Sequence, residues 1–261
     1  MYIFHTKIGD HYIQMKSSTN QIMNILNKNF PDTCSGHNQQ PDIAVMIEEG
    51  YGTPFTNYEV TIVEQSSSIL FKRADYLIEV DSDYKEAKIF VHNELAVKHA
   101  LMNLYSSFIV HHNWGLLIHS SCVLDNHKAH IFTGHSGAGK STAAKLSLPR
   151  ELLSDEATIL KITRNNVTVY NSPFRSELKG KGDEDVSPLE SIQLLHQALS
   201  NKRIELKKTE ALVQLVDKVF YWVYKPEETT KIFNLLKLLV EKVPVYELHF
   251  QKNPTFWRLI S

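Results

Sequence analysis

The sequence predicts an α/β fold in which a glycine-rich, phosphate-binding loop joins a buried strand to a helix, with a smaller β-rich lobe before it. Three observations lead to this prediction. Short β-rich runs fill the first 95 residues, the segment Gly134–Ser141 follows an apolar run directly, and helical patterns recur downstream. We therefore expect a β-rich N-terminal accessory domain over residues 1–95 and a P-loop domain over residues 96–261.

The first 95 residues predict a largely antiparallel sheet. The runs YEVTIVEQ, SILFKRADYLIEVD and AKIFVHN are rich in β-branched and aromatic residues and are separated by Asn, Asp, Gly and Ser. One early helix is expected around Ser18–Leu26. From Leu95 the apolar pattern changes to a helical one, with steps of 4, 3 and 4 residues, so a helix is expected from there to about His111.

The segment that leads into the loop contains two apolar runs, GLLIHSSCVL and KAHIF, separated by the turn-forming pair Asp125–Asn126. We expect a strand, a tight turn and a second, buried strand. Beyond the loop, a short helix should end before Pro149, because proline cannot continue a helix. Later expectations are strands in LLSDEATILKI and NVTVYNS, a loop over Pro173–Val186, a helix from the capping box Ser187–Glu190 to about Leu199, helices over Thr209–Phe220 and Pro226–Glu241, and a strand over Val245–Phe250.

Composition excludes several function classes. Lys and Arg number 28 against 29 for Asp and Glu, so no net charge attracts the chain to nucleic acid or to an anionic membrane. No apolar run has the length of a membrane span. With Cys34 and Cys122 as the only cysteines, a reducing, cytoplasmic location is expected. The 13 histidines include no group with metal-ligand spacing, so we expect surface and cavity imidazoles.

The segment Gly134–Ser141, here called the glycine-rich loop, reads GHSGAGKS and matches the pattern of a glycine, four residues and Gly-Lys-Ser. Glycines let the backbone curl so that successive N–H groups point at an anion. Lys140 would reach the β and γ phosphates, and Ser141 would offer its hydroxyl to Mg²⁺. ATP or GTP with Mg²⁺ is the expected ligand, although a turn that caps an ordinary helix is the alternative. Expected binding residues are Gly134, Ser136, Gly137, Ala138, Gly139, Lys140, Ser141 and Thr142.

Two adjacent carboxylates, Asp155 and Glu156, follow Lys140 by 15 and 16 residues at the end of an apolar run. Such a pair can divide two tasks, with one carboxylate accepting a proton from an attacking hydroxyl and the other holding Mg²⁺. A strand-end pair that caps the next turn is the structural alternative.

From Leu116 to about Lys161 the chain resembles the catalytic domain of HPr kinase, a bacterial serine kinase with a P-loop, and the related kinases of lasso peptide gene clusters. The resemblance depends on His119, 15 residues before Gly134, on GHSGAGKST, and on the early position of the acidic pair. It implies an HPr-kinase-like catalytic domain. Without it, His119 would be read as a core histidine within an apolar strand.

The resemblance also implies roles for individual residues. Asp155 would be the base that accepts the proton of a substrate serine, Glu156 the metal-side carboxylate, and His119 a neighbour of the reacting phosphate. Arg175 would stabilise the transferring phosphoryl group and Glu177 would assist with metal, although their segment departs from the family's Glu-Ile-Arg-Gly signature. This departure argues against HPr as the substrate and against phosphorylase activity.

The predicted function is ATP-dependent phosphoryl transfer to a serine of a peptide or small protein, with the C-terminal serine of a lasso peptide precursor as one candidate. A small-molecule kinase and a nucleotide-binding regulatory ATPase are the alternatives. The charged residues 175–185 and the basic segment Asn201–Lys208 could hold a peptide or could form a solvated face. Self-association is implied by the resemblance alone.

Overall fold

The computed structural model describes residues 1–33, 40–176, 178, 186–222 and 224–261. The chain divides into two compact units, Met1–His111 and His112–Ser261. The helix expected at the start of the second domain therefore belongs to the first unit, since the division falls after residue 111 and not after residue 95. No helix within the described ranges is long and apolar enough to cross a membrane.

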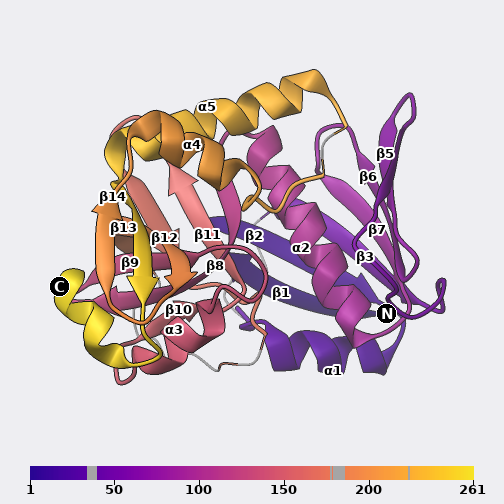
Figure 1. Cartoon of the computed structure of the whole chain (residues 1–261). Helices are drawn as coiled ribbons and strands as arrows, with labels where there is room; N and C mark the ends of the chain where they lie inside the picture. The colour runs from indigo at the N-terminus through magenta and orange to yellow at the C-terminus, as the bar shows by residue number, and fades with distance from the viewer. Residues whose placement is uncertain (34–39, 177, 179–185, 223) are drawn as a thin grey trace. The chain divides into compact units, whose positions relative to one another are not determined.

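In the described part of the first unit, seven strands form one mixed sheet in the order β1-β2-β3-β7-β6-β5-β4 (Figure 1). The expected antiparallel pattern holds for the outer pairs, but β3 runs parallel to both of its neighbours, β2 and β7. The strands are β1 (Tyr2–Ile8), β2 (His11–Ser17), β3 (Ile43–Glu49), β4 (Thr61–Glu64), β5 (Ser68–Lys72), β6 (Tyr76–Asp81) and β7 (Glu86–Val91).

Two helices pack on this sheet. α1 (Asn20–Asn29) begins after Thr19, whose side chain accepts a hydrogen bond from the backbone N–H of Ile22. α2 (Glu94–His111) begins after Asn93, whose side-chain oxygen accepts from the N–H of Ala96 at 3.1 Å. Both are side-chain caps of the kind that satisfies otherwise unpaired N–H groups of a first turn.

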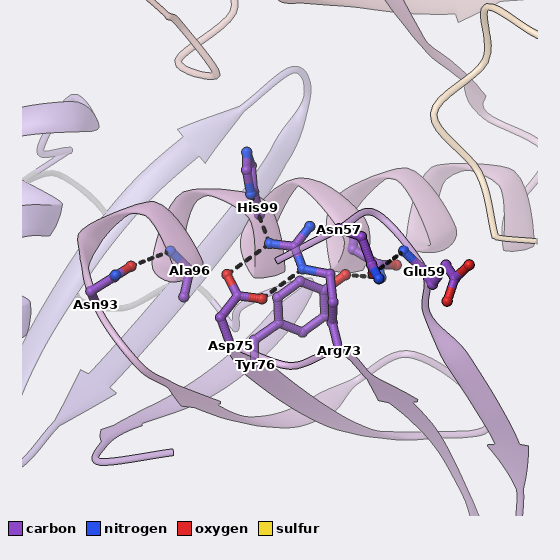
Figure 2. A network of polar contacts seen from close by, with 9 residues as sticks. Asn57, Glu59, Arg73, Asp75, Tyr76, Asn93, Ala96 and His99 are labelled. Atoms are coloured by element: carbon purple, nitrogen blue, oxygen red, sulfur yellow. Dashed lines mark hydrogen bonds and ion pairs between the residues drawn. The ribbon is translucent and has the colours of Figure 1, made fainter. Parts of the chain in front are cut away.

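A buried polar network joins α2 to the sheet of the first unit (Figure 2). Arg73 forms a two-point ion pair with Asp75, through Nε at 2.7 Å and Nη2 at 2.9 Å, and Nη2 also lies 2.7 Å from Nδ1 of His99. The guanidinium lies 4.8 Å from the ring centre of Phe55 and 4.3 Å from that of Tyr76. Burial and the neighbouring Arg73 cation lower the pKa of His99 to about 4, so its imidazole is neutral at pH 7. The network is a structural one.

Among the described residues of the second unit, five strands close into a ring. β8 (Gly115–Asp125) pairs with β11 (Ala157–Ile162), β11 with β12 (Val167–Tyr170), β12 with β13 (Val186–Gln197), β13 with β9 (Lys128–Thr133), and β9 returns to β8. β9 and β13 are parallel, and the other pairs are antiparallel. A closed ring leaves no unpaired edge over most of its length, which removes a site of aggregation.

Three further strands lie outside the ring and pair with its members or with one another. β10 (Leu152–Ser154) pairs with β8, while β15 (Val245–Phe250) runs parallel to β13 and antiparallel to β14 (Lys202–Glu205). α3 (Lys140–Leu146) packs on β8 and β9, whereas α4 (Lys208–Val216) and α5 (Pro226–Lys242) pack on each other and lie at the opposite end of the strands in Figure 1. A short 3₁₀ helix, η2 (Pro254–Leu259), ends the chain.

The α/β fold class predicted from the sequence, with an HPr-kinase-like P-loop domain, is wrong. The described residues are mostly β, with 39% of them in strands and 27% in helices. The error lies chiefly in one segment, residues 187–199, which was expected to be a helix and is most of the twelve-residue strand β13. The capping-box pattern of this segment does not produce a helix. The side chains of Ser187, Leu189 and Ser191 are buried and alternate with exposed neighbours, and the strand has pairing partners on both edges.

Candidate active site

The glycine-rich loop lies where the sequence places it, between the end of β9 and the start of α3. β9, β13 and β15 are parallel neighbours, and the loop follows the carboxyl end of β9. Ligands of parallel sheets commonly bind at this end of the strands. The side chain of Gln197, at the end of β13, donates from Nε2 to the carbonyl oxygen of Gly137 at 2.8 Å and so fixes the loop from the neighbouring strand.

Three glycines of the loop have φ values that L-residues rarely adopt, 158° at Gly134, 80° at Gly137 and 110° at Gly139. A Cβ added at Gly139 would lie 2.8 Å from Cζ of Phe250, whereas one added at Gly137 would meet nothing within 4 Å. Gly139 is therefore required both by its backbone and by packing, and Gly137 by its backbone alone.

Lys140 is the first residue of α3, and its ammonium group folds back over the loop. Nζ donates to the carbonyl oxygens of Gly134 (3.1 Å) and His135 (3.2 Å). The hydroxyl of Ser121 on β8 donates to the carbonyl oxygen of Lys140 at 3.0 Å, which ties the helix start to the sheet. Ser136 and Ser141 are exposed, Thr142 is half-buried and Ala138 is buried. The expected binding residues form one continuous segment around Lys140.

An apolar cluster supports the loop from behind. It contains side chains of β8, β9, β13, β15 and η2, with Ala138 of the loop and Ala143 of α3 in contact with them. Phe256 and Trp257 of η2 are core residues of this cluster, at 0% and 4% exposure. The buried members of the cluster are Val123, Phe132, Ala138, Ala143, Leu195, Leu248, Phe250, Phe256 and Trp257.

His119 lies on β8, two residues before Ser121, so both side chains project from the same face of the strand. Its pKa is lowered to about 4, first by burial and then by the positive charges of Lys140 and Lys218. His119 is thus a neutral imidazole within electrostatic range of Lys140. Its ring also packs on Phe220, with centroids 5.2 Å apart.

The acidic pair and the glycine-rich loop flank the same point of β8. Ser120 pairs with Thr133 of β9 on one side, and on the other its N–H donates to the carbonyl oxygen of Glu156 at 3.0 Å. Because adjacent strands lie about 4.8 Å apart, the two backbones are separated by about 10 Å across β8. The fold therefore brings together the glycine-rich loop and the acidic pair, although Ser141 and Asp155 are 14 residues apart in the sequence.

Asp155 is buried, at 5% exposure, and its carboxylate anchors the segment that follows β12. Oδ1 accepts from the N–H of Ser176 at 3.0 Å and Oδ2 from the N–H of Leu178 at 2.7 Å. These bonds orient the carboxylate. They also give Asp155 a structural role, which is related to the turn-capping alternative for the acidic pair but acts on a segment about 20 residues further along the chain.

Arg175 lies beside Asp155 and is bound to the backbone of β10. Nη2 donates to the carbonyl oxygens of Leu152 and Leu153, both at 3.2 Å, and to Oδ1 of Asn171 at 2.6 Å. Burial lowers the pKa of the guanidinium and the charge of Asp155 opposes this shift. The Arg175 side chain thus holds the segment after β12 against β10. Glu177, the other residue of this segment expected to assist with metal, lies outside the described residues.

In the second charged segment, Asn201–Lys208, the side chains of Lys202, Lys207 and Lys208 are exposed, whereas Arg203 is packed against the sheet. Residues 202–205 form β14, and Arg203 is held by the fold, with its guanidinium 3.5 Å from the ring centre of Tyr246 and Nε 3.1 Å from Oε1 of Gln193. Arg203 is a packing residue of this sheet and does not belong to a solvated basic face.

The sequence reasoning missed Lys218, because the helix expected over Thr209–Phe220 ends at Val216. The next residues run along β8, where Val219 forms a bridge with Ile118. Gln197 and Phe250 were also missed as contacts of the loop, since nothing local in the sequence links them to it. With residues of the loop they line a cavity of about 200 Å³, whose walls are Gly139, Thr142, Gln197, Ala198, Phe250 and Lys252.

The described residues contain no group of three or more His, Cys, Asp or Glu side chains that could hold a metal ion by themselves. The family described as SynChlorMet cassette protein ScmC matches residues 77–261 of the chain. The chain belongs to this family. The match begins in β6 and covers the whole second unit, including the glycine-rich loop, the acidic pair and Lys218. No curated protein matches the chain. The description of the ScmC family names no reaction, so function is argued from the site.

Proposed function

We propose that this ScmC family member transfers the γ-phosphoryl group of ATP to a serine hydroxyl of a peptide or small protein. One observation carries the proposal: a complete Gly134–Ser141 motif follows the end of a parallel strand, with its lysine beside a neutral histidine and with two carboxylates across one strand. The resemblance of Leu116–Lys161 to the HPr kinase catalytic domain supports a serine acceptor.

The loop is suited to a polyphosphate. Its glycines leave the backbone open to a close-approaching anion, and a Cβ at Gly139 would meet Phe250. Lys140 supplies a mobile positive charge that now rests on two carbonyl oxygens, which a phosphate oxygen can replace. The neighbouring cavity of about 200 Å³ is a candidate position for part of the nucleoside.

Ser141 and Glu156 are the residues that would hold Mg²⁺. Magnesium bound with nucleotide phosphates keeps several waters and needs only one or two protein ligands, so a hydroxyl and a carboxylate suffice. Ser141 is exposed at the start of α3, and Glu156 is half-buried on the other side of β8. When bound, the ion would supply charge neutralisation between the β and γ phosphates.

In the proposed reaction the serine oxygen forms a bond to the γ phosphorus, the bond from that phosphorus to the β–γ bridging oxygen breaks, and ADP leaves. The serine proton passes to the carboxylate of Asp155. Each carboxylate oxygen has two acceptor positions, so the backbone bonds from Ser176 and Leu178 are compatible with a third partner. Lys140 stabilises the negative charge of the transferring group, and His119 remains neutral beside it.

Incubation of the full chain with γ-labelled ATP, Mg²⁺ and serine peptides tests the proposal. Asp155→Asn should abolish transfer while ATP affinity stays within about threefold of wild type, and Lys140→Ala should abolish both binding and transfer. Because Asp155 accepts the backbone N–H groups of Ser176 and Leu178, Ser176→Pro, which removes one of those donors, is the matched control for the anchoring role. Transfer retained by Asp155→Asn would contradict its assignment as the base.

Mass spectrometry of the products separates the alternatives. A phosphorylated serine peptide supports the proposal, whereas phosphorylation of a metabolite alone would indicate a small-molecule kinase. Release of inorganic phosphate without any phosphorylated acceptor, at a rate that a partner protein increases, would indicate a regulatory ATPase.

A further inference from the structure

The segment after α4 continues the line of β9 along one edge of β8. β9 pairs with residues Ser120–Asp125 of β8, and the last residue of β9, Thr133, pairs with Ser120. From the next residue the partner changes: the N–H of His119 donates to the carbonyl oxygen of Lys218 at 2.8 Å, and the N–H of Phe220 donates to Leu117 at 2.8 Å. Lys218 therefore lies on this edge of β8 next to the point where the chain leaves β9 and enters the glycine-rich loop.

The side chain of Lys218 is largely enclosed there, with 11% exposure. Its positive charge lowers the pKa of both Lys140 and His119, an effect second to burial for Lys140 and third after burial and Lys140 for His119. Two ammonium groups and a neutral imidazole thus lie within electrostatic range of one another at the mouth of the loop.

Two nearby cations repel each other, and their approach is stabilised when an anion binds between them. Lys218 forms an ion pair with its neighbour Asp217, with Nζ 2.6 Å from Oδ2, but the Asp217 side chain is 71% exposed. An ion pair with such an exposed neighbour contributes little to stability. Lys218 can exchange this partner for a phosphate oxygen at small cost.

We propose that Lys218 is a second phosphate-binding cation, which contacts the terminal phosphate of a bound nucleoside triphosphate. This inference rests on the proposed function and adds to it a residue outside the motif. The terminal phosphate is favoured because Lys140 reaches the β and γ phosphates, and Lys218 lies beside Lys140 and the first residues of the loop. Thr142, by contrast, lines the cavity bounded by Phe250.

Calorimetric titration of the full chain with ATP and with ADP, each with Mg²⁺, tests this assignment. Lys218→Met keeps the length of the side chain and removes its charge, and we expect ATP affinity to fall roughly tenfold or more. ADP affinity should change less than threefold. Lys218→Arg should recover most of the ATP affinity, and Asp217→Asn should leave it unchanged or raise it.

A second measurement reports on the position of the charge without any nucleotide. Since the Lys218 cation helps to keep His119 neutral, Lys218→Met should raise the pKa of His119 in an NMR titration, and Asp217→Asn should not. Melting temperatures within a few degrees of wild type would establish that the variants fold.

The outcomes separate the two proposals. Wild-type protein that binds neither ATP nor ADP would overturn both. If wild type binds ATP and Lys218→Met binds it equally well, the role of Lys218 is refuted while the proposed function stands. Equal losses of ATP and ADP affinity would refute the assignment to the terminal phosphate.

Discussion

Replacing Gly139 by alanine separates the backbone requirement of the loop from its packing requirement. A non-glycine residue at positive φ costs about 1–2 kcal/mol, and this cost applies to Gly137→Ala and Gly139→Ala alike. Only at Gly139 does the new Cβ meet a side chain, at 2.8 Å from Phe250, which is 3% exposed within the apolar cluster. Overpacking of this kind adds about 1–3 kcal/mol.

We therefore expect Gly139→Ala to be less stable than Gly137→Ala by about 1–3 kcal/mol, a difference of roughly 2–10 °C in melting temperature for a unit of this size. Where the loop distorts instead of unfolding, the same energy appears as an ATP affinity about 5- to 150-fold weaker than that of Gly137→Ala. Differential scanning calorimetry and nucleotide titration measure the two quantities on the same samples.

The variant Phe250→Leu shows whether the contact is the cause. If the alanine Cβ and the Phe250 ring collide, the double variant should be more stable than the sum of the single effects predicts, because the smaller side chain removes the collision. Equal stability of Gly137→Ala and Gly139→Ala, or strict additivity in the double variant, would refute the packing argument.

Two further outcomes follow from the charges. NMR titration should find the pKa of His119 near 4 in the free protein and higher when ATP is bound, since the phosphates offset the Lys140 charge; an unchanged value would place the nucleotide elsewhere. Asp75→Asn should destabilise the first unit by about 3–5 kcal/mol in urea unfolding, because it leaves the buried Arg73 cation without its partner, whereas Lys28→Met, in an exposed ion pair, should cost less than about 1 kcal/mol. Similar losses in these two variants would contradict that reading of the buried network.

The sequence predicts the local features of the site well, but it does not predict which distant residues enclose the glycine-rich loop. The β8 and β9 segments, the loop and α3 are contiguous, and each is indicated by alternation, turn residues or glycine spacing within a short window. The helix expected at residues 187–199 failed because pairing with β9, β12 and β15 outweighs a local capping pattern. That decision depends on segments about 60 residues away in the chain, which no local window contains.

The same reason explains the residues that were missed or reassigned. Lys218 follows a helix that ends earlier than its periodicity suggests, because the next residues bond to β8. Asp155 was expected to face a substrate, and its carboxylate also holds the backbone of residues 176 and 178. A carboxylate at a strand end is visible in the sequence, but its hydrogen-bond partners depend on the tertiary fold.

The order of strands around the loop has a consequence for how the protein is made. The motif is complete once residue 141 has been synthesised, yet the groups that enclose it come from β13, the segment after α4, and β15, up to Phe250. Contacts between such distant parts of a chain form late in folding. A ribosome-bound or truncated chain that ends near residue 200 therefore carries the whole motif without the groups that enclose it, so the proposed nucleotide site is complete only after the last strand has added to the sheet.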